Sequence, residues 1–303
     1  MLFAGTGTKT GRIADYPSSA NVSPQTTADG LPWFIGQVKA NEAWRNTGAG
    51  NNVIVAVLDT GIDGNHPDLT DKVVDEVNFT DSQTTGDVNG HGTMTAGLIT
   101  SYLDNLKGVA GVAYRSYLLN VKVADDNGFV RPESVAQGII WATDHGANVI
   151  NLSLTLATPD ETVANAISYA WSKGVVLVAA AGNSGSSKPV YPAAYPHVIG
   201  VAATDESDHL AKWSNKGNWV SVSAPGVDIT STLPDDGYGV KSGTSYATAL
   251  VSGEAALLIA VAWNENSDVT INKEVRDAIL QNVDVQSVNR VDIADPVAYI
   301  TRK

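Results

Sequence analysis

The hydrophobic positions of this chain fall into short continuous runs that alternate with helical patterns from Leu31 onward. Continuous runs rich in Val, Ile and Ala are typical of strands buried on both faces of a parallel sheet. Strands are therefore predicted at residues 53–59, 116–124, 147–154, 175–182 and 198–203. Helical patterns predict helices at residues 91–103, 132–146, 160–174, from Ser245 onward, and 271–283.

Strands and helices in alternation predict an α/β fold, a three-layer sandwich with a mostly parallel sheet. A length of 303 residues suits one large domain of this kind, which we expect to span residues 29–303. Residues 1–28 are rich in Gly, Ser, Thr and Pro and indicate an N-terminal arm or leader remnant, to which we assign no chemistry. Functional groups in such folds collect at the carboxyl ends of the strands.

Composition excludes several classes of function. The net charge of −13 would repel nucleic-acid phosphate, so no nucleic-acid partner is expected. The absence of cysteine excludes disulfides, thiol catalysis and thiolate metal sites. No uninterrupted apolar run reaches the roughly 18 residues of a membrane span, so no membrane association is expected.

Four polar stretches stand at the ends of these predicted elements. Asp59 ends the first strand in "DTGID", and Asn183 follows a later strand in "AAAGN". His91 lies between two glycines at a helix start, where we expect an exposed ring that the helix dipole keeps neutral. Ser245 lies at the start of the last long apolar helix, in "SGTSYAT". Each residue alone also fits a turn or a helix cap.

Together the four residues supply the parts of one reaction. A hydroxyl becomes a nucleophile when a base takes its proton, and the base must be oriented by a third group. An amide beside the nucleophile suits the negative oxygen of acyl transfer, and the backbone NH of Ser245 could assist it. The set therefore predicts nucleophilic acyl transfer.

The order and spacing of "DTGID", "GHGT", "AAAGN" and "SGTSYAT" resemble those of the subtilisin-like serine proteases, the subtilases. The resemblance extends from about Asp29 to the C-terminus and implies a subtilisin-like fold and a serine endopeptidase. It implies that Ser245 attacks the peptide carbonyl and that His91 acts as general base and then acid. It further implies that Asp59 orients the imidazole and that Asn183 holds the oxyanion.

The resemblance also implies how substrate binds. Two segments of the enzyme pair with the substrate backbone as the strands on either side of it. Main-chain pairing of that kind gives broad specificity. Val190 falls at the bottom of the primary specificity pocket, where its branched side chain should favour small or medium apolar P1 residues, those that precede the cleaved bond. The matching edge positions are Gly128, Phe129 and Val130 in the first segment and Ser153, Leu154 and Thr155 in the second.

A structural calcium ion is implied as well. Oxygen ligands of mixed carboxylate and carbonyl type suit this hard cation. The matching ligands are the side chains of Asp29, Asp68 and Asn105 and the carbonyls of Leu103, Lys107 and Val109.

The chain departs from the family pattern at several positions. Tyr246 replaces the usual Met after the nucleophile, so tolerance of oxidants is expected. Ala249 replaces a common Pro, and Thr155 and Leu156 replace two glycines of a substrate edge. These changes leave open a processing or peptide-joining enzyme on the same scaffold. A non-catalytic binding module is a third reading, against which the intact set of four residues argues.

The resemblance implies protein or peptide substrates, a prodomain during maturation, and secretion. We expect signal and prodomain to be absent from this chain, since its first 30 residues hold no apolar signal core and residues 1–28 are too short for a prodomain. A monomer is expected, because the family's site needs no partner chain.

Overall fold

The predicted apolar runs form the middle of one parallel sheet. The computed structural model describes residues 11–13, 15–16, 30–103, 109–265, 271–281, 283–284 and 290–291. Strands of the large sheet are β2 (Ile54–Asp59), β3 (Val73–Asn78), β4 (Tyr117–Lys122), β6 (Val149–Leu152), β8 (Val176–Ala180), β9 (Val198–Thr204), β10 (Val222–Pro225), β13 (Val283–Asp284) and β14 (Arg290–Val291). Their order is β13-β14-β10-β9-β8-β6-β2-β4-β3, and every neighbouring pair is parallel except β13 with β14.

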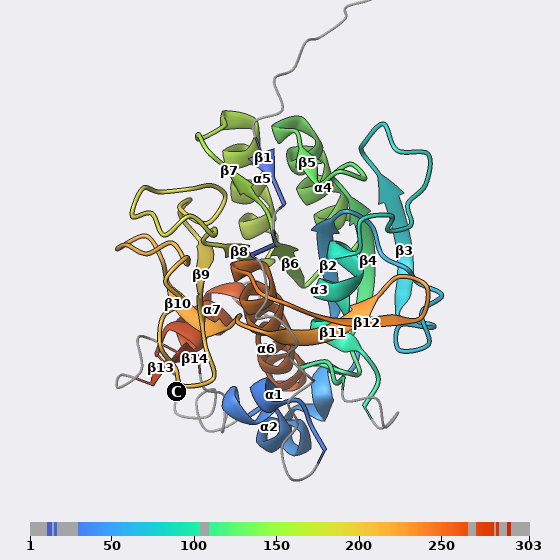
Figure 1. Cartoon of the computed structure of the whole chain (residues 1–303), viewed down its shortest axis with the longest axis vertical. Helices are drawn as coiled ribbons and strands as arrows, with labels where there is room; N and C mark the ends of the chain where they lie inside the picture. The colour runs from blue at the N-terminus through green and yellow to red at the C-terminus, as the bar shows by residue number, and fades with distance from the viewer. Residues whose placement is uncertain are drawn as a thin grey trace, which may run out of the picture.

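Helices cover both faces of this sheet (Figure 1). They are α1 (Trp33–Gln37), α2 (Ala40–Thr47), α3 (His91–Thr100), α4 (Pro132–Asp144), α5 (Glu161–Ser172), α6 (Thr244–Glu265) and α7 (Ile271–Gln281), with a 3₁₀ turn at Gly48–Gly50. Side chains of β2 alternate between two cores. Val55 and Val57 join the core under α3 and α6, whereas Ala56 and Leu58 join the core under α4 and α5. The predicted three-layer α/β fold is confirmed.

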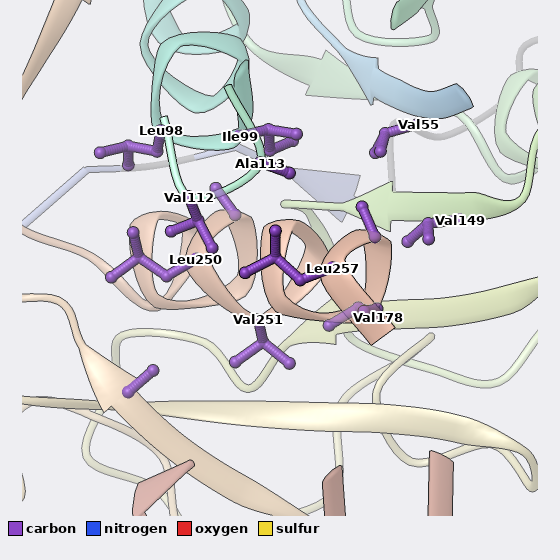
Figure 2. Close-up of a cluster of buried hydrophobic side chains, with 14 of the residues drawn as sticks. Val55, Leu98, Ile99, Val112, Ala113, Val149, Val178, Leu250, Val251 and Leu257 are labelled. Carbon is purple, nitrogen blue, oxygen red and sulfur yellow. The ribbon is translucent and has the colours of Figure 1, made fainter. Parts of the chain in front are cut away.

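The central helix α6 is apolar on all sides over Thr244–Val261 because this stretch is enclosed on all sides. It packs against α2, α3, α7 and the strands β6, β8, β9 and β10. Figure 2 shows Leu250 and Leu257 of this helix among the side chains of α3 and the sheet. Among the described helices, α6 alone is long and apolar enough to cross a membrane, and its apolar stretch Thr244–Val261 is entirely buried in the protein. Its composition is therefore that of a core helix.

Several short elements lie outside the predicted pattern. The hairpin β11 (Ile229–Leu233) and β12 (Gly237–Lys241) packs its first strand on α3. A separate three-stranded antiparallel sheet joins β5 (Phe129–Val130), β1 (Gly11–Arg12) and β7 (Thr155–Leu156), in that order. The apolar pattern predicted none of these strands, nor α1, α2, β3 and β10, since each is short or lacks a continuous apolar run. The family resemblance alone indicated strand edges near β5 and β7.

Replacement of Leu257 by Ala should lower the free energy of unfolding by about 2–5 kcal/mol, because it leaves a cavity in the core around α6. Chemical denaturation would measure this in a Ser245→Ala background, which prevents self-digestion. The control Ile140→Ala removes a side chain that is 42% exposed and should change stability by less than about 0.5 kcal/mol. Equal losses for the two variants would contradict this description of the core.

Candidate active site

A buried carboxylate and a buried imidazole meet at the carboxyl end of the sheet. Asp59 is the last residue of β2, and His91 is the first residue of α3. Nδ1 of His91 lies 2.8 Å from Oδ1 and 2.9 Å from Oδ2 of Asp59. Asp59 is fully buried and His91 is 1% exposed. The amide of Thr60 also donates to Asp59 Oδ1, at 2.7 Å, which fixes the carboxylate against the ring.

Helix α3 begins at His91 because Asp87 satisfies its first free amides. The carboxylate of Asp87 accepts hydrogen bonds from the amides of Gly90 and Thr93, both at 2.8 Å. Gly92 is required at the next position, since a Cβ there would lie 2.0 Å from the carbonyl oxygen of Gly61. The close approach of the two backbones brings the imidazole within reach of Asp59.

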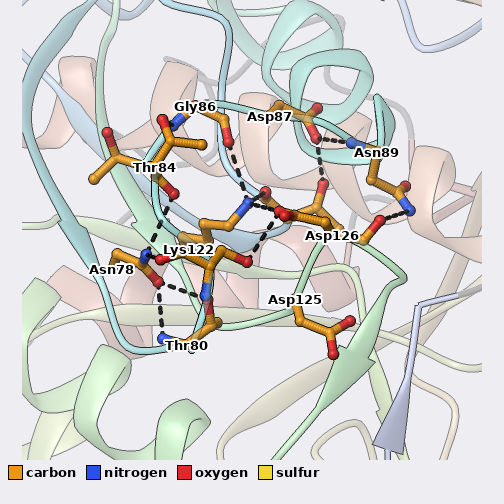
Figure 3. A network of polar contacts seen from close by, with 12 residues as sticks. Asn78, Thr80, Thr84, Gly86, Asp87, Asn89, Lys122, Asp125 and Asp126 are labelled. Atoms are coloured by element: carbon orange, nitrogen blue, oxygen red, sulfur yellow. Dashed lines mark hydrogen bonds and ion pairs between the residues drawn. The ribbon is translucent and has the colours of Figure 1, made fainter.

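Lys122 connects the turn after Asp59 to the loop before His91 (Figure 3). Its buried ammonium donates to the carbonyl oxygens of Thr60 and Gly86 and forms an ion pair with Asp126 at 2.8 Å. Thr60 in turn donates to Asp87, Oγ1 to Oδ1, at 2.8 Å. Sequence reasoning missed both Lys122 and Asp87. A Lys inside an apolar strand and an Asp just before a helix start were the available indications.

The expected state of His91 is wrong on two counts. The ring is buried, because Asp59, Tyr246 and the N-terminal arm surround it, with the Tyr246 ring centroid 5.7 Å away. Burial alone lowers the pKa of His91, but the nearby carboxylates of Asp59 and Asp15 outweigh it, so the pKa is raised above its ordinary value. The sequence had suggested an exposed ring whose pKa the helix dipole lowers, whereas the ring is buried and its pKa is raised by these two charges.

Ser245 lies in the first turn of α6 and is held against Ser153. Its hydroxyl donates to the Ser153 carbonyl at 3.2 Å, and the Ser153 hydroxyl donates to the Ser245 carbonyl at 2.9 Å. Within the described parts of the chain, Nε2 of His91 has no hydrogen-bond partner. The ring's second nitrogen is therefore available for proton exchange, while the adjacent Tyr246 brings the Ser245 segment alongside the ring.

Asn183 is fixed by the residue before Ser245. Its Oδ1 accepts hydrogen bonds from the amide and the hydroxyl of Thr244, at 3.0 and 2.8 Å. The carbonyl end of the side chain is thus turned toward the helix start, and Nδ2 is the donor end of the amide. Asn183 and Ser245 line the same pocket.

That pocket, of about 250 Å³, gathers most of the predicted substrate residues. Val190 lies in its wall, as do Arg12 of the N-terminal arm and the whole of the second predicted edge: Ser153, Leu154 and Thr155. Of the first predicted edge, Phe129 and Val130 form β5, and Gly128 directly precedes that strand. The two edges face each other across β1, which pairs with both.

The N-terminal arm thus lies in the predicted substrate cleft. We call residues 11–13 and 15–16 the arm segment. Gly11 pairs with Val130 and Leu156, and Arg12 pairs with Phe129 and Thr155. The sequence assigned no chemistry to this region, and nothing in its composition distinguishes it from an ordinary extended arm.

The predicted calcium ligands are only partly described. Asp29, Asn105 and Lys107 lie outside the described residues. Asp68 is buried, accepts a hydrogen bond from Tyr238 at 2.9 Å, and receives the amide of Tyr102 at its carbonyl, 3.1 Å away. Leu103 follows Tyr102, and Val109 is buried on the far side of the gap. No group of three His, Asp or Glu side chains that could hold a metal occurs in the described part, so a cation here would rely on carbonyls and on the undescribed positions.

Comparison with known proteins places this chain in a family. Residues 50–294 match the model of the Subtilase family. The chain is 45% identical over 243 residues to the thermophilic serine proteinase of Bacillus sp. (strain AK1), covering 80% of this chain and 59% of that protein. It is 44% identical to thermitase of Thermoactinomyces vulgaris, covering 73% of this chain and 80% of thermitase. It is 40% identical to subtilisin of Bacillus pumilus, covering 83% of this chain and 91% of that subtilisin.

The chain therefore belongs to the subtilase family. The resemblance that the four motifs predicted is confirmed, and the matched family and the names of the relatives point to the class of serine endopeptidases. The chain spans about three fifths of the length of the thermophilic serine proteinase.

A raised pKa of His91 has a consequence for the pH dependence of the reaction. A general base works in its neutral form, so kcat/KM should rise with pH and reach half of its maximum above about 6.5, the ordinary value for His. Hydrolysis of a peptide ester or amide across a pH series would measure the midpoint. A midpoint at or below the ordinary value would contradict the charge environment described for the ring.

Proposed function

We propose that the protein is a serine endopeptidase that hydrolyses peptide bonds through an acyl-enzyme on Ser245. The observation that supports this best is the buried pair of Asp59 and His91, set beside a serine at the start of α6. A buried imidazole with one nitrogen on a carboxylate and the other directed away from it suits a base that passes a proton. No other described feature of the cleft calls for such a pair.

Each step assigns one proton. Ser245 Oγ attacks the carbonyl carbon of the substrate while His91 Nε2 takes the hydroxyl proton. The imidazolium is stabilised by Asp59, and it then gives its proton to the leaving amine as the peptide C–N bond breaks. Water attacks the remaining ester in the same way, and the proton returns from His91 to Ser245. In the structure the Ser245 hydroxyl donates to Ser153, so it must turn toward His91 when substrate arrives.

Asn183 is proposed to stabilise the oxyanion. Because Thr244 occupies its Oδ1, Nδ2 is the end of the amide that can donate to the developing negative oxygen. The backbone NH of Ser245, in the first turn of α6, would be the second donor, and the helix dipole favours negative charge at this point.

Substrate is proposed to bind as a strand between β5 and β7. Main-chain pairing on both sides supports broad specificity, since it does not depend on side chains. Val190 in the pocket wall supports a preference for small or medium apolar side chains before the cleaved bond. By analogy with its relatives, we propose that the protein is secreted, matures from a form with a prodomain, and acts as a monomer on protein substrates.

A structural calcium ion is proposed at Asp68. The buried carboxylate, the neighbouring Leu103 and the mixture of carboxylate and carbonyl oxygens fit a hard cation, with Asp29, Asn105, Lys107 and Val109 completing the set. Bound there, the ion would supply charge that fixes the loop after α3.

The central test is a mixed peptide library analysed by mass spectrometry with the intact protein and with Ser245→Ala. Cleavage should be lost in Ser245→Ala, and Asn183→Ala should lower kcat by about 10²–10³ with little change in KM. The exposed Asn218→Ala serves as the matched control and should retain full activity. Cleavage that persists in Ser245→Ala would contradict the proposal, and joined peptides would instead indicate a peptide-joining enzyme.

The residue before each cut tests the role of Val190. Val190→Gly should enlarge the pocket and raise kcat/KM for substrates with Phe or Tyr at P1 relative to those with Ala. The matched control Val88→Gly changes an exposed valine and should leave the preference unaltered. No gain on aromatic substrates with Val190→Gly would show that another residue limits the pocket.

Calcium binding should raise the melting temperature of the protein. A chelator should lower the melting temperature of the Ser245→Ala protein, and calcium should restore it, because an ion that binds only the folded state stabilises that state. Asp68→Asn should remove most of this difference, whereas Asp277→Asn, on the surface of α7, should preserve it. A melting temperature that neither chelator nor calcium changes would contradict the proposed calcium site.

A further inference from the structure

Three segments of the chain converge on one buried ammonium group (Figure 3). Lys122, the last residue of β4, is fully buried, although a lysine is rarely buried unless its charge is paired. Its Nζ donates to the carbonyl oxygen of Thr60 and, at 3.1 Å, to that of Gly86, and it lies 2.8 Å from Asp126 Oδ1. Because an ammonium has three N–H donors, these three acceptors satisfy it completely.

The first segment is the turn that follows Asp59. Strands β2 and β4 pair in a register that sets Asp59 opposite Lys122, so the lysine side chain begins beside the carboxylate residue and reaches the carbonyl of the next one, Thr60. The amide of Thr60 donates to Asp59 Oδ1 at 2.7 Å, and its hydroxyl donates to Asp87. Thr60 is thus held at its carbonyl by Lys122 while its amide fixes the carboxylate.

The second segment is the loop before His91. Three successive carbonyls of this loop, those of residues 84–86, each accept a hydrogen bond from a side-chain nitrogen. The pairs are Thr84 with Asn78 at 3.2 Å, Thr85 with Asn120 at 3.0 Å and Gly86 with Lys122 at 3.1 Å. The Gly86 carbonyl belongs to the same peptide group as the amide of Asp87, whose carboxylate caps the helix that begins at His91. The charged donor therefore holds the loop where it meets the helix.

The third segment is the turn that leads into the predicted substrate edge β5. Asp126 lies in this turn and accepts a hydrogen bond from the Ser82 hydroxyl at 3.0 Å, while its carbonyl accepts one from Asn89 at 3.2 Å. The hydrogen bond from Lys122 lowers the pKa of Asp126, so the carboxylate stays ionised at neutral pH. The same ammonium thus anchors the chain on the way to Phe129, the first residue of β5.

We propose, given the endopeptidase function proposed above, that Lys122 is a positioning residue that sets Asp59 against His91. Through Asp126 it also keeps this pair at a fixed spacing from the substrate edge β5. Lys122 touches neither the reacting atoms nor the proposed path of the substrate, and it acts through the backbone of the turn and of the loop.

The charge of Lys122, and not only its bulk, carries this role. A neutral side chain of similar size would fill the space but would donate no hydrogen bond to Thr60 or Gly86. Apolar residues of similar volume often stabilise a protein as well as a buried ion pair does, so packing alone does not call for a lysine here. Proton transfer is more demanding, since a displacement of about 1 Å can cost a factor of about 10² in rate.

The first measurement is the titration of His91 by ¹⁵N spectra of full-length Ser245→Ala chains, which needs no activity. Loss of a nearby positive charge by itself would raise the pKa of the imidazole, whereas displacement of Asp59 from the ring would lower it. Lys122→Met should therefore lower the pKa of His91. The control Lys273→Met removes a lysine that is 64% exposed and forms an ion pair of the same i,i+4 spacing, and it should leave the pKa unchanged. A pKa that is unchanged or raised in Lys122→Met would overturn the proposal.

The second measurement is kcat and KM on a peptide substrate with full-length chains that retain Ser245. Lys122→Met should lower kcat by a factor of about 10², because the base is misplaced. Asp126→Ala should raise KM about threefold with a smaller change in kcat, because it releases the turn before β5. The controls Lys273→Met and Asp277→Ala should change neither constant. Equal constants for all chains would overturn the positioning role and leave the endopeptidase function standing.

Two further outcomes are separated by the same set of chains. If the spectra show that Lys122→Met is unfolded, Asp126→Ala decides instead, because its side chain is 37% exposed and its loss leaves the core packed. An unchanged KM in Asp126→Ala would then overturn the proposal. If no chain cleaves any peptide, the parent included, the endopeptidase function fails, while the titration of His91 still decides whether Lys122 positions the pair.

Discussion

The hydrogen-bonded pair of Asp59 and His91 is the interaction on which the remaining site depends. Two groups that carry charge are taken almost completely out of water, and such groups are stable only when paired and hydrogen-bonded. The neighbouring residues meet that requirement. Thr60 donates to the carboxylate, Asp87 satisfies the first amides of the helix that carries the ring, and Lys122 joins the two loops. With these contacts made, Nε2 of His91 is the atom of the pair that can exchange a proton with the nucleophile.

The fold brings Asp59 and His91 to the nucleophile because strands and helices that carry these residues end or begin at the same edge of the sheet. Parallel strands deliver their last residues to one edge, so Asp59 at the end of β2 and Asn183 after β8 reach the same side of the sheet. The buried helix α6 begins at that edge and carries Ser245 in its first turn. Its apolar body packs in the core (Figure 2) and holds the hydroxyl in place. This explains why a helix built for burial starts with polar residues.

Much of this arrangement was predictable from the sequence, and the failures have physical causes. Buried strands such as β2 and β8 are recognised by their continuous apolar runs. The motifs "GHGT" and "SGTSYAT" are specific enough to indicate the residues of the site. The half-exposed β3 lacks such a run, and its pairing with β4 is a tertiary contact. The turn Pro234-Asp235-Asp236-Gly237 could have revealed the β11–β12 hairpin. The raised pKa of His91 was not predicted, because the charge of Asp59 and, to a lesser extent, that of Asp15 outweigh the effect of burial. The path of the arm segment was beyond prediction, because it depends on pairing with β5 and β7, far away in sequence.

The protonation of His91 tests the buried pair most directly. A full-length Ser245→Ala chain, labelled with ¹⁵N at histidine, would give the titration curve of this ring separately from those of the other four histidines. The two neighbouring carboxylates predict a pKa above the ordinary value of about 6.5. They also predict that Asp59→Asn lowers it, since the closer of the two charges is lost. A ring that titrates at or below the ordinary value, or that ignores Asp59→Asn, would contradict the central role given to this pair.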